Sequence, residues 1–313
     1  MSGWRLVGDV GGSNARFARA SGNALSGRRH YAVADYPSFY AALARYLDEI
    51  GGPGGCHSGA IGVAGPVDNG HVKLTNAAWT IDAREVAPLL GGVPTEIVND
   101  LQAVALALPF LGEQDLLPLG NAVRTGGARR TMHALNVGTG FGATAVIPAR
   151  DGWVACGSEP GHMTLGAVDA DELGLIGEGG HGSVEDLLSG RGVLTLYGRI
   201  ATRRGAQQLA GPCGSEIFVR AGSDPIAAET LLCFTRLLGR VAGDLVLASG
   251  AWGGVYLCGS VAQGWAAVAD VDEFRKHFER KSVMSERMRG VFSGVIKPDD
   301  TPLVGLTHLP MGG

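Results

Sequence analysis

The stretch Leu6-Val7-Gly8-Asp9-Val10-Gly11-Gly12-Ser13-Asn14-Ala15-Arg16 decides the fold of this chain. Apolar residues lead to an acid, two glycines and a hydroxyl, and an extended run then resumes, which predicts a strand, a tight turn and a strand. Gly11 and Gly12 are expected to take the positive φ angles of a two-residue hairpin. Their N–H groups and the Ser13 hydroxyl can surround an anion, beside which Asp9 would need a cation. A phosphate and Mg²⁺ site explains these residues, and an ordinary Gly-Gly hairpin with an exposed Asp explains them about equally well.

The composition indicates a folded globular protein. Of the 313 residues, 45% are hydrophobic and 18% are charged, which separates the chain from disordered proteins and allows two domains with separate cores. Glycine, with 51 residues, has about twice its usual share and gathers in short turn clusters. The net charge of −4 and the scattered arginine pairs, without interleaved aromatic residues, argue against a nucleic-acid partner.

The cysteines and the apolar runs bear on the compartment. The five cysteines form no close pair, so the sequence contains neither a zinc motif nor a redox pair. We expect reduced, buried thiols in a reducing compartment. The first expected strand begins almost at once after Met1, which leaves no room for a signal peptide, and Asp244 interrupts the longest candidate for a membrane span. The sequence therefore predicts a cytoplasmic protein without a membrane segment.

The first hundred residues alternate between strand and helix patterns. Apolar residues at helical spacing run over 39–50 and end at Gly51-Gly52, and Asp82 can cap a helix over 82–90. The other expected elements of this part are strands over 60–64 and 95–98 and an apolar helix over 101–108. The polar, basic loop over 112–131 is the expected crossing between domains.

The second half opens with a repeat of the same pattern. A strand over 134–137 leads into Gly138-Thr139-Gly140-Phe141-Gly142, and β-branched residues over 143–147 predict a second strand. A Rossmann turn would require a helix after the glycines, so that alternative is disfavoured. Asp224 and Pro225 predict the start of a long helix. Beyond it we expect a strand and small-residue turn over 253–260 and a charged amphipathic surface helix over 272–289.

An anion-binding hairpin in each half indicates two related lobes that face each other over a nucleotide, as in the actin-like ATPase and sugar-kinase superfamily. Seven motifs then stand in the order of one family, and they are Val7-Gly8-Asp9-Val10-Gly11-Gly12-Ser13-Asn14-Ala15-Arg16, Thr75-Asn76-Ala77-Ala78-Trp79, Ile97-Val98-Asn99-Asp100, Gly138-Thr139-Gly140-Phe141-Gly142, Glu159-Pro160-Gly161-His162, Glu185-Asp186-Leu187-Leu188-Ser189-Gly190 and Gly254-Val255-Tyr256-Leu257-Cys258-Gly259. On these motifs the chain resembles the bacterial glucokinase family over nearly its whole length. It lacks the zinc-binding cysteine cluster of the repressor-type sugar kinases.

The resemblance implies a fold and an activity. The fold is α/β, a two-domain actin-like ATPase (ribonuclease H-like) fold with a cleft between a small α/β domain, 1–110 plus about 299–313, and a larger α+β domain, 111–298. The implied activity is the transfer of the γ-phosphoryl group of ATP to the 6-hydroxyl of glucose, a step of glycolysis, in a homodimer. Two alternatives stay open: a kinase of fructose, mannose or an N-acetylhexosamine, and a non-catalytic nucleotide- or sugar-binding regulator.

The resemblance also implies the nucleotide site. Both glycine turns would cradle the ATP phosphates, because phosphoryl transfer depends mostly on positioning and charge neutralisation. Asp9 would hold Mg²⁺ through water, since Mg²⁺ keeps much of its hydration shell. The implied nucleotide-binding positions are Asp9, Gly11, Gly12, Ser13, Asn14, Gly138, Thr139, Gly140 and Gly259, the last in a turn against which the adenosine packs.

Asp100 is the expected general base. It follows a strand and begins a helix, and the sugar 6-hydroxyl needs an acceptor for its proton when it attacks the phosphoryl group. The residue types alone are equally consistent with a simple helix cap, and the resemblance favours catalysis. The implied sugar-binding positions are Asn76, Asn99, Asp100, Glu159, His162 and Glu185.

Several residues depart from the family pattern. Pro160 stands where the family has a glycine, which stiffens the turn before His162 and removes one N–H. Ser260 replaces a second glycine of the adenosine turn, and Ser13 keeps the hydroxyl of the usual threonine. The last residues, 301–313, resemble the family only loosely, and Pro310 shortens the expected closing helix.

Overall fold

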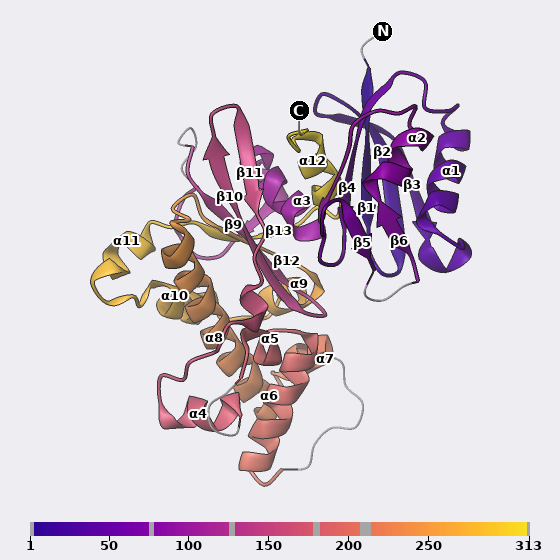
Figure 1. Ribbon diagram of the computed structural model, residues 1–313. Coiled ribbons are helices and arrows are strands. Elements are labelled where there is room, and N and C mark those ends of the chain that lie inside the picture. Colours follow the sequence, from indigo (N-terminus) through magenta and orange to yellow (C-terminus); the bar gives the residue numbers. More distant parts are fainter. Residues whose placement is uncertain (1–2, 75–77, 125–128, 178–181, 207–213, 312–313) are drawn as a thin grey trace. The chain divides into compact units, whose positions relative to one another are not determined.

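The computed structural model describes residues 3–74, 78–124, 129–177, 182–206 and 214–311 (Figure 1). These form a mixed α/β structure that divides into two compact units. The first unit comprises Met1–Leu111, Val146–Gly157 and Pro298–Gly313, and the second comprises Gly112–Ala145 and Ser158–Lys297. The segment 146–157 thus groups with the first unit, whereas the sequence placed it in the larger domain. The assignment of the two functional domains stays a prediction.

The first unit is built on a five-stranded sheet of order β3-β2-β1-β4-β7. Its strands are β1 (Trp4–Val10), β2 (Asn14–Ser21), β3 (Ala24–Ala32), β4 (Cys56–Val63) and β7 (Thr95–Asn99). β1 and β2 form an antiparallel hairpin, while β1, β4 and β7 run parallel. Carboxyl ends of parallel strands meet at one edge of a sheet, so the ends of β1 and β7 lie on the same side. A small antiparallel pair, β5 (His71–Lys73) and β6 (Thr80–Asp82), completes the strands.

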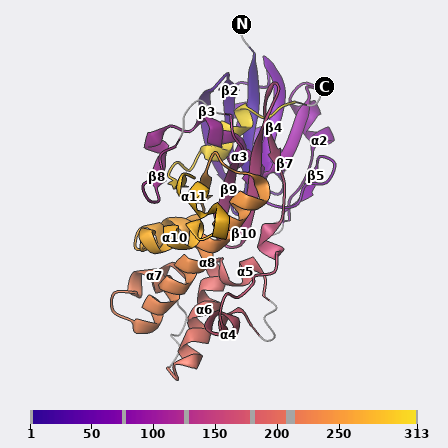
Figure 2. The same cartoon turned by 90° about the vertical axis from the view of Figure 1, so that its left-hand side faces the viewer.

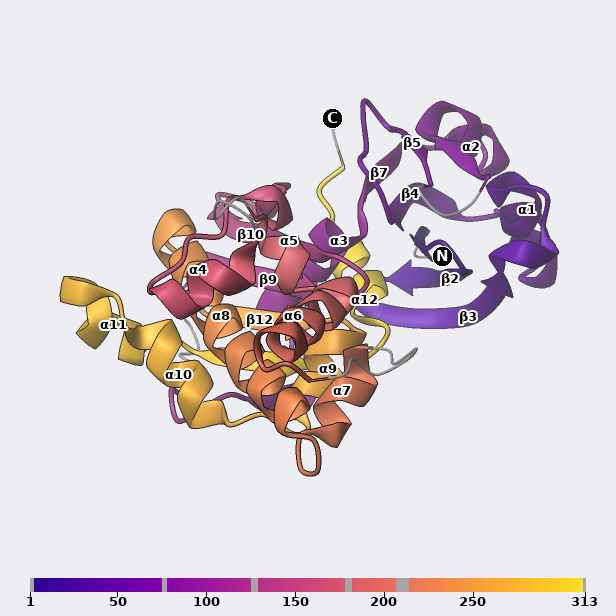
Figure 3. The ribbon, with the colours of Figure 1, turned by 90° about the horizontal axis from the view of Figure 1, so that it is seen from below.

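Helices cover both faces of this sheet. α1 (Phe39–Glu49) and α2 (Ala83–Leu89) lie on one side of the strands, and α3 (Asp100–Ala107) and α12 (Thr301–Thr307) lie together on the other (Figure 3). Leu6, Phe17 and Leu43 belong to the apolar core on the α1 side. On the other side α3 and α12 approach closely, because a Cβ built on Gly305 of α12 would meet the Ala103 oxygen at 1.7 Å. Only glycine allows these two backbones to touch.

The second unit carries most of a six-stranded sheet of order β11-β10-β9-β12-β13-β8. Its strands are β8 (Leu116–Pro118), β9 (Met132–Val137), β10 (Phe141–Ala149), β11 (Gly152–Cys156), β12 (Val255–Cys258) and β13 (Ser293–Ile296). Its helices are α4 (Ala170–Ile176), α5 (Val184–Leu187), α6 (Gly190–Arg203), α7 (Gly214–Arg220), α8 (Pro225–Ser249), α9 (Ser260–Ala266), α10 (Val271–Glu279) and α11 (Ser285–Arg289). α8 lies between α10 on one side and α6 and α7 on the other (Figures 1 and 2).

Local signals explain many of these elements. Asp224 caps α8, because its Oδ1 accepts hydrogen bonds from the backbone N–H groups of Ile226 and Ala227, and Pro225 occupies the first helical position. The same helix ends at Gly250 in the left-handed conformation. Asp82 caps α2 as the sequence predicts. β10 follows the second glycine turn as a strand, which confirms the rejection of a Rossmann turn.

Four expectations about local structure were wrong. Gly11 and Gly12 are not among the described glycines with a left-handed φ, because three residues, 11–13, connect β1 to β2 and a primed two-residue turn is not needed. The expected loop over 112–131 contains β8, which pairs with β13. The helix expected over 272–289 is broken after Glu279 into α10 and α11.

The fourth concerns the cysteines, which are less buried than expected: Cys156 at the end of β11 is exposed, and Cys56, Cys233 and Cys258 are only partly buried. Cys213 lies outside the described residues. Among the helices that the structure describes, none is both long and apolar enough to span a membrane.

Candidate active site

The carboxylate of Asp9 lies near the end of β1, on the side of the sheet that α3 and α12 cover. Asp9 is buried and pairs in register with Gly62 of β4, and a Cβ built on Gly62 would meet Ala103 of α3 at 3.2 Å. The Arg16 guanidinium holds the Asp9 Oδ2 with Nε at 3.0 Å and Nη2 at 2.6 Å. Arg16 Nη1 also donates to the Asp299 carbonyl at 2.7 Å. The cation beside Asp9 in this structure is therefore an arginine.

Asp100 begins α3 at the end of β7, as the sequence predicts. The N-cap of this helix is Asn99, not Asp100: the Asn99 Oδ1 accepts the Leu101 N–H at 2.9 Å, and Gln102 Oε1 completes a capping box. Asn99 Nδ2 donates to the Gly65 carbonyl at 3.1 Å. The Asp100 Oδ1 also accepts the Leu101 N–H, at 2.8 Å. With the cap supplied by its neighbour, the Asp100 carboxylate is not needed to start the helix.

The two carboxylates influence each other. Burial raises the pKa of Asp100, the negative charge of Asp9 raises it further, and together they bring it to about 6. Burial also raises the pKa of Asp9, while the Arg16 charge and hydrogen bond oppose that rise. A carboxyl group whose pKa lies near 6 can accept a proton at neutral pH and hold it more firmly than an ordinary aspartate. This edge of the first unit can therefore perform general base chemistry.

The first glycine turn, residues 11–13, is open. The Gly11 N–H donates to the Asn14 carbonyl at 2.8 Å, and the Ser13 carbonyl accepts the Val33 N–H at 2.9 Å. Ser13 and Asn14 are exposed. A Cβ built on Gly11 would meet no atom closer than the Asn14 oxygen at 3.8 Å. The chain itself therefore leaves room for a side chain at Gly11.

The second glycine turn, residues 138–141, is held by its surroundings. The Gly138 N–H donates to the Gly140 carbonyl at 3.0 Å, and the Gly138 carbonyl accepts the N–H of Gly190, the first residue of α6, at 2.8 Å. The exposed Thr139 lies between them. Gly259, which has a φ of +95°, precedes α9, and a Cβ there would meet the Val137 oxygen at 2.5 Å. The N-termini of α6 and α9 thus lie against this turn, with N–H groups and positive dipole ends suited to an anion.

Glu185 joins this turn to the predicted sugar residues of the second unit. Its Oε2 accepts the Phe141 N–H at 2.9 Å, and a Cβ on Gly140 would lie 2.6 Å from the same oxygen. Gly161 is equally confined, because a Cβ there would meet the Phe141 oxygen at 2.3 Å. Gly161 belongs to the short 3₁₀ turn Pro160–His162. Three segments therefore meet at Phe141.

Glu159 and His162 flank that meeting point with exposed side chains. The Glu159 carbonyl accepts the His162 N–H at 3.2 Å, while Pro160 and Gly161 are buried. Glu185 is partly exposed, and its Oε1 lies 3.4 Å from Arg191. These carboxylates and the imidazole can donate to or accept from hydroxyl groups of a sugar.

The structure thus brings Asp9, Asn99 and Asp100 together at one edge of the first unit, and it gathers the turn 138–140, Glu159, His162 and Glu185 around Phe141 in the second. Asn76 lies outside the described residues. The sequence reasoning missed Gly62, Gly161 and Gly190, which the site needs for close packing. A single glycine carries no local signal of such a contact, and only the motif position of Gly161 and Gly190 hinted at it.

The donor set bears on a metal. No group of three or more His, Cys, Asp or Glu side chains that could hold an ion occurs in the described part of the chain. The first unit offers two carboxylates, Asp9 and Asp100, whose negative charges oppose each other. Such a pair fits Mg²⁺, which keeps several waters and takes one or two protein carboxylates together with phosphate oxygens.

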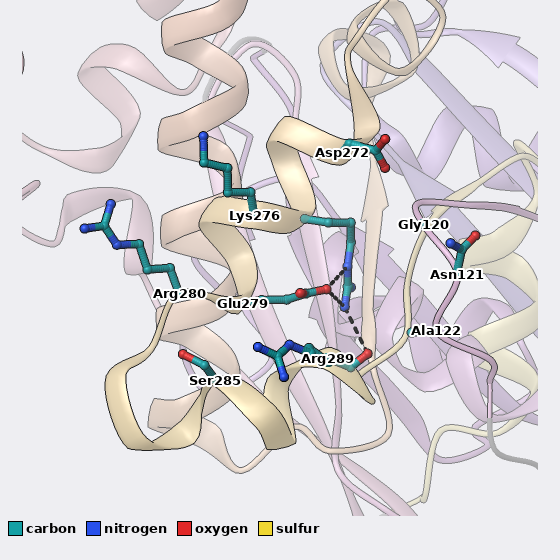
Figure 4. A pocket seen from close by; sticks show the side chains of 10 residues that line it. Gly120, Asn121, Ala122, Asp272, Lys276, Glu279, Arg280, Ser285 and Arg289 are labelled. Atoms are coloured by element: carbon teal, nitrogen blue, oxygen red, sulfur yellow. Dashed lines mark hydrogen bonds and ion pairs between the residues drawn. The ribbon is translucent and has the colours of Figure 1, made fainter.

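A separate cavity of about 710 Å³ lies in the second unit and contains none of these residues (Figure 4). Arg275 at its wall is buried and uses its guanidinium on the Glu279 carboxylate, the Ser293 hydroxyl and carbonyls that include Arg289. Figure 4 shows the side chains of Lys276 and Arg280 extending away from Glu279. The arrangement joins α10 to α11 and β13, which is a structural role.

Comparison with known proteins agrees with the motif order. The glucokinase family model matches residues 6–311. A glucokinase of Nitrobacter hamburgensis is 33% identical over 317 residues, which cover 99% of this chain and 98% of the relative. One of Chromobacterium violaceum is 36% identical, with 90% and 82% covered. The crystal structure of a glucokinase from an Antarctic psychrotroph has a TM-score of 0.86 and 28% identity, and covers 97% of this chain and 98% of its own. The chain also spans about half, 48%, of a bifunctional protein glk of Burkholderia orbicola at 34% identity.

Proposed function

This chain belongs to the glucokinase family, and from that membership we propose how it transfers the γ-phosphoryl group of ATP to the 6-hydroxyl of glucose, giving glucose 6-phosphate and ADP. The observation that carries the mechanism is the Asp100 carboxyl group, whose pKa is raised to about 6 at the junction of β7 and α3. The protein is an ATP-dependent hexose kinase with the actin-like ATPase fold.

Asp100 acts as the general base. The glucose 6-hydroxyl becomes a better nucleophile as its proton passes to the Asp100 carboxylate, and the oxygen then attacks the γ-phosphorus while ADP leaves. Burial supports this role, because a desolvated carboxylate accepts a proton more readily than one in water. Asn99 supports it by capping α3, which fixes the backbone from which Asp100 projects. Asn99 Nδ2 donates to the Gly65 carbonyl, and a hydrogen bond from the Asn99 side chain to Asp100 opposes the rise in the pKa of that carboxyl group.

Asp9 would hold Mg²⁺ through water, and the bound ion would neutralise the charge of the phosphates. The fit rests on the two opposing carboxylates at this edge and on the preference of Mg²⁺ for a mostly hydrated site. Until the ion is present, the Arg16 guanidinium neutralises Asp9. Arg16 therefore opposes the rise that burial gives to the pKa of Asp9, and it holds the carboxyl group in place.

The nucleotide phosphates would lie against both glycine turns, with Gly11, Gly12, Ser13 and Asn14 in the first and the residues 138–140 in the second. The Gly11 and Gly138 N–H groups donate within the turns, so these glycines would act by letting the phosphates approach the backbone. The open space at Gly11 supports this role, since nothing in the chain itself excludes a side chain there. The N-termini of α6 and α9 add positive dipole ends beside the second turn. Adenosine would pack against the turn at Gly259, where the positive φ and the close approach of Val137 require glycine.

Glucose would be held by Glu159, His162 and Glu185 of the second unit, with Asn99 and Asp100 of the first. A hydroxyl-rich ligand must regain the hydrogen bonds that it loses to water, and paired carboxylate and imidazole groups can supply them. Asn76 belongs to the same proposal by its motif. A cytoplasmic location and a homodimer, which the resemblance implies, stay predictions.

Release of ADP, measured in a coupled assay with a panel of hexoses, tests this function. Glucose should support the highest kcat/KM, and the product should carry phosphate on the 6-hydroxyl. A higher kcat/KM with fructose, mannose or an N-acetylhexosamine would reassign the sugar. No ADP release above the sugar-free rate with any hexose would indicate a binding protein without turnover.

A further inference from the structure

We infer that Ser189 is a positioning residue that fastens the sugar carboxylate of Glu185 to the second glycine turn, so that glucose and nucleotide each strengthen the binding of the other through this link. The inference rests on the proposed function for the roles of Glu185 and the turn. Ser189 belongs to the motif Glu185-Asp186-Leu187-Leu188-Ser189-Gly190, from which only Glu185 has a proposed contact with substrate.

The first attachment joins Glu185 to the end of the turn. Its Oε2 accepts the Phe141 N–H at 2.9 Å, and the missing side chain of Gly140 makes room for that oxygen, which would lie 2.6 Å from a Cβ there. A charge-assisted hydrogen bond of this kind is stronger than one between neutral groups. A shift of the Glu185 carboxylate must therefore move Phe141 or break this bond.

The second attachment joins the start of the turn to α6. The Gly190 N–H donates to the Gly138 carbonyl at 2.8 Å. Little space separates the two segments, because a Cβ on Gly190 would meet the same carbonyl oxygen at 3.4 Å. Whatever fixes the first turn of α6 therefore also fixes Gly138.

Ser189 connects the two attachments. Its side chain is completely buried, its Oγ donates to the Glu185 carbonyl at 2.8 Å, and it accepts the Gly192 N–H at 3.0 Å as the N-cap of α6. Phe141 therefore donates to Glu185, Ser189 donates to Glu185, and Gly190, the residue after Ser189, donates to Gly138. The turn 138–141 closes this ring covalently.

An ordinary N-cap serine only has to accept a hydrogen bond from a backbone N–H group of its own helix. Ser38 at the start of α1 accepts the Ala41 N–H at 3.2 Å and caps a helix of 11 residues. Ser189 uses its hydroxyl hydrogen as well, on the residue proposed to bind sugar. Its removal should therefore cost both the cap and the link between the two binding groups, whereas the loss of Ser38 should cost the cap alone.

The test measures the dissociation constant of Mg²⁺–ADP by calorimetry with and without saturating glucose. ADP and glucose cannot react, so both bind at equilibrium, and the ratio of the two constants is the coupling factor. Wild type should give a factor in the usual range of about 5 to 150. Ser189→Ala should give less than about a third of the wild-type factor, whereas Ser38→Ala, which loses a helix cap of the same kind, should keep it.

Two further variants separate the link from the cap. Ser189→Gly keeps an acceptable N-cap residue and should lose coupling as Ser189→Ala does, so it serves if the alanine variant fails to fold. Ser189→Thr keeps the hydroxyl and should keep the factor. An unchanged factor in Ser189→Gly, or a wild-type factor of one, overturns the inference. If the wild type phosphorylates no hexose in the separate coupled assay, the proposed function is overturned instead.

Discussion

The two glycine turns have similar sequence patterns, but their surroundings differ: charged side chains lie near the first turn, and tight packing surrounds the second. At the first turn a side chain on Gly11 would meet nothing closer than 3.8 Å, and the neighbourhood is governed by the charges of Asp9, Arg16 and Asp100. At the second turn the chain itself excludes a side chain on Gly140, whose Cβ would lie 2.6 Å from Glu185 Oε2. Gly11 leaves open space in which a ligand can lie, whereas the space beside Gly140 is filled by the Glu185 side chain of the same protein.

This difference separates function from stability. Changes at Gly11 and at the carboxylate of Asp100 should alter chemistry while the fold survives, because the space at Gly11 is open and Asn99 supplies the cap of α3. Changes at the second turn should lower the free energy of unfolding, because the packing there is too tight to accept an added side chain. The predictions below test that division, beginning with the largest effect.

Asp100→Asn should lower kcat by about 10²- to 10⁴-fold, the usual cost of losing a positioned general base. The Asn side chain can still accept the Leu101 N–H, so the fold should persist. The folded-state pKa of Asp100 lies above the usual value, so its ionisation costs stability as pH rises from about 4 to 6. At pH 8 the neutral variant should therefore unfold at a higher temperature than wild type. A near-normal kcat would reduce Asp100 to a structural residue.

Gly161→Ala should lower the free energy of unfolding by about 1–3 kcal/mol, because the new Cβ must displace the Phe141 carbonyl, which lies 2.3 Å from its ideal position. Chemical denaturation measures this loss. Gly166→Ala is the matched control in the same unit, since no atom lies within 4 Å of a Cβ there. Equal stability of the two variants would show that the second turn is not tightly packed.

Asp9→Asn should weaken the binding of Mn²⁺ in the presence of ADP by at least about tenfold, because a neutral amide is a poor partner for a hydrated divalent ion. Electron paramagnetic resonance of free Mn²⁺ measures the affinity without turnover. Asp82→Asn, a carboxylate at the N-cap of α2, is the control and should leave Mn²⁺ binding unchanged. Undiminished Mn²⁺ affinity in Asp9→Asn would remove Asp9 from the metal site.

Gly11→Ala should change the free energy of unfolding by less than about 0.5 kcal/mol, since its φ is not left-handed and the space is open. The KM for ATP should nevertheless rise, because a methyl group would stand where phosphate approaches the backbone. Denaturation and steady-state kinetics on one preparation give both numbers. A marked loss of stability with an unchanged KM for ATP would show that the first turn, like the second, serves packing and not ligand binding.

Local sequence signals predicted much of the fold because they act between neighbours. Asp224 with Pro225 marked the start of α8, and Asp82 marked the start of α2, since a cap bonds residues two or three positions away. The placement of Asp9 and Asp100 at strand ends also follows from local patterns. The influence of Asp9 on the pKa of Asp100 does not, because it depends on the register of β1, β4 and β7.

Long-range contacts explain what the sequence did not predict. β8 exists because it pairs with β13, far along the chain. The helix expected over 272–289 is interrupted at Arg280 and Lys281, where Lys281 donates to the Arg240 carbonyl at 2.8 Å. Gly239 and Gly243 of α8 let α10 approach so closely that a Cβ on either would meet a backbone oxygen at 2.4 Å. No pattern within the segment records these partners.

The pH dependence of kcat/KM for glucose tests the central claim, that Asp100 is the base, most directly, since it reports the essential ionisation of the free enzyme. Asp100 must be ionised to accept a proton, so the wild-type value should be level at neutral pH and fall tenfold per unit below an apparent pKa of about 6. The residual activity of Asp100→Asn should lack this acid limb. A wild-type profile that stays level well below pH 6, or an Asp100→Asn profile that keeps the limb, would contradict the account.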